Sequence, residues 1–163
     1  GSEMCIRDST PCVDDVFSRL DSIREKKQAV LHMDIPTDWE LYGDPFYWAQ
    51  ILFNLVENAL KQNTEPGLSI TVSAAKTQDA CVITVTDTGV GIPAESIPFL
   101  FNRFYRVETH HSSEIKGTGL GLSIVKRAVE AHDGTITVSS IPHRETVFTI
   151  TIPLKRFREE KAA

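Results

Sequence analysis

Apolar residues recur at helical spacing in three stretches of the chain and alternate with polar residues in most of the segments between them. The helical stretches cover residues 13–27, 44–62 and 120–132, with Asp44-Pro45 as a helix start and Gly134 as a helix stop. The alternating stretches predict strands over residues 29–33, 39–42, 68–75, 80–86, 135–139 and 146–153. A short helix or helical turn is predicted over residues 94–104. The pattern therefore predicts one domain that combines helices with strands.

The helix predicted over residues 44–62 has two contrasting faces. One broad face is apolar and consists of Trp48, Ile51, Leu52, Leu55, Val56, Ala59 and Leu60. The opposite stripe holds Asn54, Glu57, Asn58 and Lys61. Charged helix faces are usually solvated, which is one interpretation of this stripe. The other interpretation is a cation site, because two asparagines in mid-helix cost helix propensity and their side-chain oxygens suit Mg²⁺.

A carboxylate stands at the end of the strand predicted over residues 80–86. Cys81, Ile83 and Val85 share one face of this strand, and Asp87 falls on the same parity. A carboxylate on a buried face is costly unless a donor reaches it. The glycine turn over residues 88–93 leaves two interpretations open. Asp87 either caps the strand in an Asx turn or accepts the exocyclic amine of a purine.

A glycine-rich loop over residues 116–123 precedes the last predicted helix, with Gly117, Gly119 and Gly121 on alternate residues. Glycines allow successive N–H groups to face one anion, and the helix start adds its own donors. The loop either cradles a phosphate chain or is a helix start without a ligand. The polar segment 107–117 before it is typical of a lid. His110 and His111 in that segment are expected to be solvated rather than metal ligands.

Composition narrows the class of partner. The chain has 163 residues, 41% apolar residues, a formal net charge of −5 and a pI near 5.5, which argue against nucleic acid or an anionic membrane as the main partner. No run of about 18 apolar residues and no signal-peptide pattern is present. Cys5, Cys12 and Cys81 lack metal-type spacing and fit reduced cytosolic thiols. Residues 1–12 are expected to be a tag remnant or linker, and residues 155–163 a charged tail.

Four motifs now stand in a fixed order along the chain. They are Asn-Leu-Val-Glu-Asn-Ala-Leu-Lys at 54–61, Asp-Thr-Gly-Val-Gly-Ile-Pro at 87–93, Phe-Asn-Arg-Phe-Tyr-Arg at 101–106 and Gly-Thr-Gly-Leu-Gly-Leu at 117–122. They resemble, in turn, the asparagine, first glycine, phenylalanine and second glycine boxes of the ATP-binding catalytic domain of sensor histidine kinases. Gyrase, MutL and the heat-shock chaperone ATPases share that domain's fold. The resemblance covers residues 13–154.

The fold that this resemblance implies is an α/β (α+β) two-layer sandwich of the Bergerat type. About five strands in a mixed, mainly antiparallel sheet pack on about three helices, and an ATP lid closes the site. The domain organisation is then a linker at 1–12, the ATP-binding domain at 13–154 and a tail at 155–163.

The resemblance also implies roles for individual residues. Asn58 would coordinate Mg²⁺ through its side-chain oxygen, and Asn54 would support the metal and the phosphates of ATP. Lys61 would lie along the phosphates, and Arg106 would neutralise charge on the γ-phosphate, so Asn58, Lys61 and Arg106 are the implied catalytic residues. Asp87 would accept the adenine amine. The other residues implied at the nucleotide are Gly89, Gly91, Ile92, Tyr105, Gly117, Thr118, Gly119, Leu120, Gly121 and Leu122.

The chain departs from the family pattern at two places. After Lys61 the family usually carries an aromatic residue or histidine and then a small hydroxyl residue, whereas this chain has Gln62 and Asn63. The last hairpin usually contains Gly-x-Gly, whereas residues 141–145 read Ile-Pro-His-Arg-Glu. Neither departure falls on a residue implied to bind metal, phosphate or adenine.

The implied activity is that of a protein histidine kinase in two-component signalling. The domain would bind Mg-ATP and donate the γ-phosphoryl group to a histidine on a separate dimerisation and phosphoacceptor domain. No histidine here has the context of a phosphoacceptor, since His132-Asp133 is followed at once by Gly134. The two alternatives are a gyrase- or MutL-type ATP hydrolase, which would need an acidic residue at the position of Asn54, and a non-catalytic nucleotide-sensing docking module.

The resemblance also implies partners and a location. The domain's own phosphoacceptor helices and a downstream response regulator are the expected protein partners. A monomer without nucleic-acid binding or direct membrane contact is expected. The domain would be the cytoplasmic part of a bacterial inner-membrane sensor protein.

Overall fold

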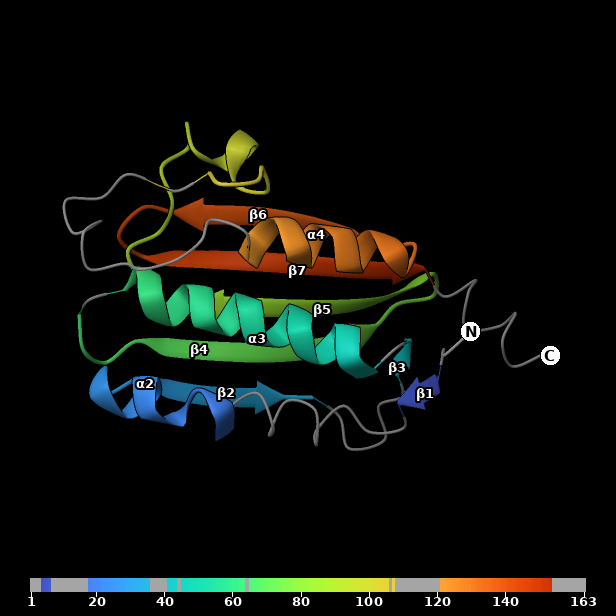
Figure 1. Cartoon of the computed structure of the whole chain (residues 1–163), viewed down its shortest axis with the longest axis horizontal. Helices are drawn as coiled ribbons and strands as arrows, with labels where there is room; N and C mark the ends of the chain where they lie inside the picture. Colours follow the sequence, from blue (N-terminus) through green and yellow to red (C-terminus); the bar gives the residue numbers. More distant parts are fainter. Residues whose placement is uncertain are drawn as a thin grey trace.

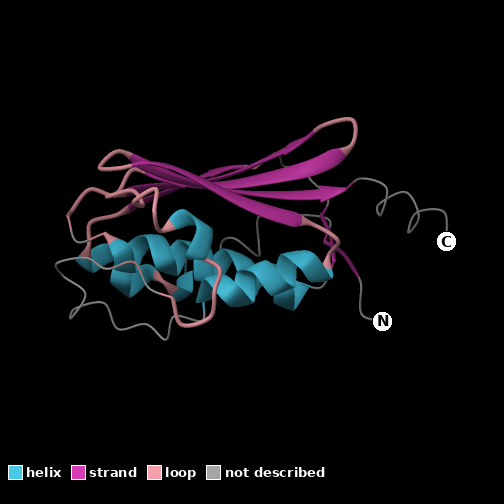
Figure 2. Cartoon of the chain, turned by 90° about the horizontal axis from the view of Figure 1, so that it is seen from above, coloured by secondary structure: helices cyan, strands magenta, loops and turns pink. Residues whose placement is uncertain are grey.

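The computed structural model describes residues 4–6, 18–35, 41–43, 45–63, 65–105, 107 and 121–153. Within these residues, three helices form one layer and five strands form the other (Figure 2). The helices are α2 (Asp21–Lys26), α3 (Pro45–Gln62) and α4 (Gly121–Ala131). The large sheet contains β2 (Val30–Asp34), β4 (Ser69–Lys76), β5 (Ala80–Asp87), β6 (Thr135–Ile141) and β7 (Glu145–Pro153). This arrangement confirms the predicted two-layer α/β sandwich.

The sheet has the strand order β2-β4-β5-β7-β6, in which only the β2–β4 pair is parallel. It is therefore mixed and mainly antiparallel, as predicted. Figure 1 shows α2 beside β2, α3 across β4 and β5, and α4 across β6 and β7. Each helix thus covers its own part of the same sheet face.

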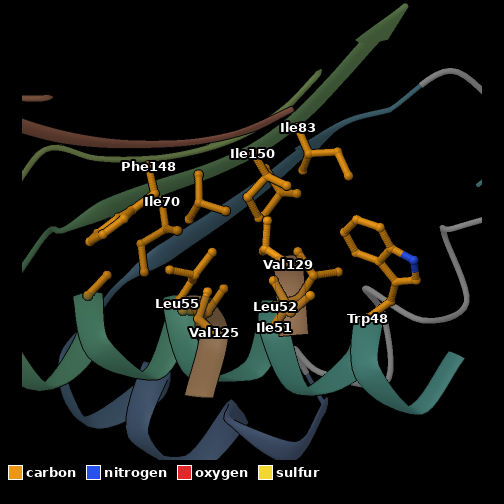
Figure 3. Close-up of a cluster of buried hydrophobic side chains, with 14 of the residues drawn as sticks. Trp48, Ile51, Leu52, Leu55, Ile70, Ile83, Val125, Val129, Phe148 and Ile150 are labelled. Atoms are coloured by element: carbon orange, nitrogen blue, oxygen red, sulfur yellow. The ribbon is translucent and has the colours of Figure 1, made fainter. Parts of the chain in front are cut away.

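The hydrophobic core lies between the two layers. In β5 and β7 buried and partly exposed residues alternate along the whole strand, as a sheet covered on one face requires. The seven apolar residues predicted on one face of α3 are all buried. Figure 3 shows Trp48, Ile51, Leu52 and Leu55 of α3 and Val125 and Val129 of α4 meeting Ile70, Ile83, Phe148 and Ile150 of the sheet. The apolar side chains that the helical and strand periodicities predict to be buried therefore pack together in one core.

Several element boundaries differ from those predicted. A short strand, β1 (Met4–Ile6), pairs antiparallel with β3 (Leu41–Gly43) in a separate two-stranded sheet. The sequence predicted no element before residue 13, because three residues are too few for a periodic signal and the partner strand is far along the chain. In the stretch 94–104 only Ile97–Phe99 is helical, as a 3₁₀ turn. The proposed boundaries at residues 12–13 and 154–155 lie outside the described residues.

No helix in the described part of the chain has both the length and the apolar character needed to cross a membrane.

Two substitutions on β7 test whether only one face of the sheet is covered. Ile150 is fully buried, while Thr149 on the opposite face is partly exposed. Ile150→Ala is expected to lower the free energy of unfolding by about 2–5 kcal/mol, because it leaves a cavity in the core. Thr149→Ala is expected to cost less than about 1 kcal/mol, since only strand propensity changes. Urea unfolding of both variants measures this, and equal losses would contradict a one-faced core.

Candidate functional site

The polar stripe of α3 lies on the side of the helix away from the core. Asn54, Glu57, Asn58 and Lys61 are all partly exposed, in contrast to the buried apolar face. Lys61 Nζ lies 3.3 Å from Glu57 Oε1, one helical turn away. The sequence-predicted separation of the two faces is confirmed. The stripe presents two amide oxygens, one carboxylate and one ammonium group along a single line of the helix.

The start of α4 lies against this stripe. A Cβ atom placed on Gly121 would lie 3.8 Å from Asn54 Oδ1. The helices α3 and α4 pack together closely, and Figure 1 shows them side by side over the sheet. The fold therefore brings the end of the second glycine motif, Gly121 and the partly buried Leu122, beside the asparagine motif. The other residues predicted here, Arg106, Gly117, Thr118, Gly119 and Leu120, lie outside the described residues, as do His110 and His111.

Asp87 ends β5 on the face that is buried in the core. The residue is only 6% exposed. Its Oδ1 accepts a hydrogen bond of 2.9 Å from the N–H of Gly89, and burial raises the pKa of the carboxyl from 3.8 to about 6. Among the described residues, Oδ2 has no hydrogen-bond donor. A buried oxygen in this position is an acceptor available to a ligand that carries an N–H group.

The turn after Asp87 is held by Asn63, which follows the last residue of α3. Asn63 is 4% exposed. Its Oδ1 accepts the N–H of Val90 at 2.7 Å, and its Nδ2 donates to the carbonyl of Ala59 at 2.6 Å. A Cβ atom on Gly89 would lie 1.9 Å from Asn63 Oδ1, so only glycine fits there. The two side-chain hydrogen bonds of Asn63 therefore connect the turn to the end of α3, the helix that carries the polar stripe.

Sequence reasoning treated Asn63 only as a departure from a family pattern. Nothing in the local periodicity marks it, because its partners Val90 and Gly89 lie far along the chain. The only sign in the sequence that Asn63 has a special role is its departure from the family pattern at the second position after Lys61.

The hairpin between β6 and β7 holds the other side of the turn. Ser140 Oγ accepts the N–H of Ile92 at 2.7 Å, and the N–H of His143 donates to the carbonyl of Val90 at 2.7 Å. Gly91 has φ +74°, and a Cβ there would lie 2.6 Å from the carbonyl oxygen of Ile141. The close approach of the hairpin explains this glycine. Its predicted place beside a purine base stays a prediction.

Two further predicted residues flank this region. Ile92 is buried in the core cluster directly after the turn. Tyr105 is partly buried, and its ring centroid lies 5.8 Å from that of Phe99. Their contact with a nucleotide stays a prediction.

The donor set limits what metal the site can hold. The described part of the chain contains no group of three or more His, Cys, Asp or Glu residues that could hold a metal ion. Mg²⁺ commonly takes only one or two protein oxygens and completes its coordination with phosphates and water. The side-chain oxygens of Asn54 and Asn58 on one stripe fit that limited role.

Comparison with known proteins gives a family for this arrangement. Residues 43–156 match the family model "Histidine kinase-, DNA gyrase B-, and HSP90-like ATPase". The chain is 37% identical over 149 residues to the adaptive-response sensory kinase SasA of Synechococcus elongatus, covering 90% of this chain and 38% of SasA. It is 38% identical over 112 residues to the sensor histidine kinase WalK of Bacillus subtilis, covering 68% of this chain and 18% of WalK.

A solved structure agrees with these matches. The mycobacterial sensor histidine kinase MprB is similar with a TM-score of 0.77 and 25% identity, over 92% of this chain and 97% of the MprB chain. The chain thus spans well under half the length of the two curated relatives.

Asp87 also makes stability depend on pH. Because its pKa is higher in the folded state, about 6 against 3.8, the folded state retains the proton longer, and stability falls as pH rises between these values. At pH 7.5 the ionised form costs about 3 kcal/mol. Asp87→Asn is expected to be about 1–2 kcal/mol more stable than wild type at pH 7.5, since an unpaired amide N–H offsets part of the gain.

The measurement is urea unfolding of both proteins at pH 7.5 and at pH 3.5. The stability difference should shrink at pH 3.5, where the Asp87 carboxyl of wild type is also neutral. A variant less stable than wild type at pH 7.5 would show that the carboxylate contributes favourably to the fold.

Proposed function

Because the chain belongs to the histidine kinase-, DNA gyrase B- and HSP90-like ATPase family, as an ATP-binding domain of the histidine kinase type, we propose that it binds Mg-ATP and donates the γ-phosphoryl group to a histidine on a separate domain. The observation that carries this proposal is the buried carboxylate of Asp87, whose turn is pinned to the end of α3. One rigid unit then presents a purine acceptor and a stripe of phosphate and metal ligands.

The adenine end of the site is recognised by hydrogen bonding. Asp87 Oδ2 accepts a hydrogen bond from the exocyclic amine of the base, while Oδ1 stays on the N–H of Gly89. Guanine presents a carbonyl oxygen at the corresponding carbon, so two acceptors would face each other in the buried site. The same carboxylate thereby both binds adenine and discriminates against guanine.

The phosphate end lies along α3 and the start of α4. The side-chain oxygen of Asn58 would hold the metal, and Asn54 would support the metal and the phosphates. Lys61 would place its ammonium group along the phosphate chain. Bound Mg²⁺ supplies neutralisation of the negative charge on the phosphates. The family resemblance adds two further phosphate ligands. They are the backbone N–H groups of the second glycine motif and the guanidinium of Arg106. Phosphoryl transfer needs mainly such positioning and neutralisation.

The acceptor histidine is supplied from elsewhere. Its ring nitrogen attacks the γ-phosphorus, the bond to the β–γ bridging oxygen breaks, and ADP leaves with that electron pair. His132, the only histidine in the sequence that is followed by an acidic residue, is 4% exposed, and its Nδ1 lies 2.7 Å from the carbonyl of Ala128. It is buried in the core and therefore unsuited to receive a phosphoryl group.

We infer the wider setting from the relatives' names, which are those of sensor kinases. The proposed partners are dimerising phosphoacceptor helices of the same protein and a downstream response regulator. The proposed location is the cytoplasmic side of a bacterial membrane sensor, with this domain a monomer by itself.

ATP hydrolysis is the less favoured alternative. A hydrolase of the gyrase or MutL type needs a general base to activate water, and Asn54 occupies that position in this chain. A non-catalytic docking module is also less favoured, because Asn54, Asn58, Lys61 and Asp87 are all present together.

The metal role of Asn58 is tested by calorimetric titration with a non-hydrolysable ATP analogue, with and without Mg²⁺. Wild type is expected to bind one analogue, more tightly with Mg²⁺. Asn58→Ala is expected to lose about 10–100-fold in affinity with Mg²⁺ and little without it, because one ligand to the metal is removed. Gln78→Ala, in the exposed turn between β4 and β5, is the matched control. Equal losses with and without metal would remove Asn58 from the metal site.

The transfer reaction is tested with γ-labelled ATP and the phosphoacceptor helices of the parent protein, supplied as a separate polypeptide. Label is expected on the helices only when this chain is present, and the chain alone is expected to release phosphate slowly. Rapid phosphate release by the chain alone would favour a hydrolase. Nucleotide binding without labelling of the helices would favour the docking module.

A further inference from the structure

Asn63 connects the helix that carries the polar stripe to the turn that carries Asp87. Its side chain makes one hydrogen bond to each, to the carbonyl of Ala59 in α3 and to the N–H of Val90 in the turn. The carbonyl of Asn63 accepts a hydrogen bond of 2.9 Å from Lys27 Nζ, which also donates to the carbonyl of Leu60. Asn63 is thus fixed by its backbone and its side chain together.

The hydrogen bonds of the turn show why this residue matters. The N–H of Gly89 is bound by Asp87, the N–H of Ile92 by Ser140, and the carbonyl of Val90 by the N–H of His143. These partners come from the strand itself or from the β6–β7 hairpin. Among the described residues, Asn63 alone reaches the turn with a hydrogen bond from the α3 side. It therefore determines how the turn lies relative to α3.

The contact with Gly89 has a direct bearing on Asp87. Gly89 donates the one hydrogen bond that the Asp87 carboxylate receives from the described residues. The amide group of Asn63 fills the space where a side chain of Gly89 would lie. Moving Asn63 would release the N–H of Val90, in the peptide between Gly89 and Val90. The adjacent peptide, between Thr88 and Gly89, donates the hydrogen bond to Asp87, so freedom at Val90 reaches the carboxylate through Gly89.

We propose that Asn63 is a positioning residue for purine selection, which holds the Asp87 carboxylate in register with the phosphate-binding stripe of α3. This rests on the proposed function of the site. Asn63 contacts the turn rather than the nucleotide, and it acts through Gly89 and Val90.

The first test needs no nucleotide. Amide hydrogen exchange of Gly89 and Val90 is compared with that of Ile83 in the core strand, in wild type, Asn63→Ala and Ile150→Ala. In Asn63→Ala both turn amides are expected to exchange at least about tenfold faster relative to Ile83, since Val90 loses its acceptor. In Ile150→Ala the exchange rates of Gly89 and Val90 are themselves expected to stay within about twofold of wild type, because a global loss of stability leaves the local opening of the turn unchanged. An unchanged ratio in Asn63→Ala overturns the proposal.

The second test measures the affinities for ATP and GTP analogues. Asn63→Ala is expected to weaken ATP binding about 10-fold and to reduce the preference for ATP over GTP by a similar factor. Asn63→Ser, which keeps a hydroxyl oxygen, is expected to retain part of that preference. Ile150→Ala is expected to keep both affinities despite its lower stability. Equal losses for ATP and GTP in Asn63→Ala, with selectivity intact, overturn the proposal.

A double-mutant cycle with Asp87→Asn separates action through Asp87 from an independent effect. In the Asp87→Asn background, Asn63→Ala is expected to add less than about twofold to the loss of ATP affinity, because its effect passes through the missing carboxylate. Full additivity overturns the proposal. If wild type binds no nucleotide, the proposed function of the site is wrong, and so is the role of Asn63 in purine selection. The hydrogen-exchange result still decides whether Asn63 orders the turn, so the two failures can be told apart.

Discussion

Burial of one face of α3 is the constraint on which the rest of the structure depends. Seven apolar side chains of this helix are buried in the core with residues of the sheet and of α4, and each of the six larger ones contributes on the order of 1.5–3 kcal/mol through burial. A rotation of the helix that exposed them would cost most of the stability of a domain of this size. The opposite stripe, with Asn54, Asn58 and Lys61, is therefore held in one direction. The core thus fixes the orientation of the polar residues independently of the Lys61–Glu57 ion pair within the stripe.

The second constraint is the carboxylate at the end of β5. The alternation that buries Cys81, Ile83 and Val85 also buries Asp87, and its ionised form is unfavourable there. Hydrogen bonds from the described residues stabilise one of its oxygens and leave the other without a donor. The fold thus tolerates a local cost in stability at the position where the proposed function requires a buried acceptor for the base. This is the usual relation between a strained or desolvated group and a binding site.

Much of this arrangement was predictable from the sequence, and the remainder has a common cause. Helical spacing predicts α3 with its two faces, and strand parity predicts that Asp87 lies on the buried side of β5. The pairing of β1 with β3 and the contacts of Ser140 and His143 with the turn were not predicted. Each of these joins residues that are far apart along the chain, so local patterns carry no signal for them. The roles of Asn58, Lys61 and the glycine motifs came from resemblance and stay predictions.

Asn63 shows how the two constraints are joined. The core sets the direction of α3, and strand parity sets the burial of Asp87, but neither determines the distance between the stripe and the carboxylate. That distance depends on the end of α3, where Lys27 binds the carbonyls of Leu60 and Asn63 and the Asn63 amide reaches Val90. A ligand that is recognised at both ends binds best when its two subsites are held at a fixed distance from each other. Motion of one subsite relative to the other would otherwise have to be lost on binding, at a cost in free energy. A side chain that touches neither end of the ligand can therefore control how well both ends bind.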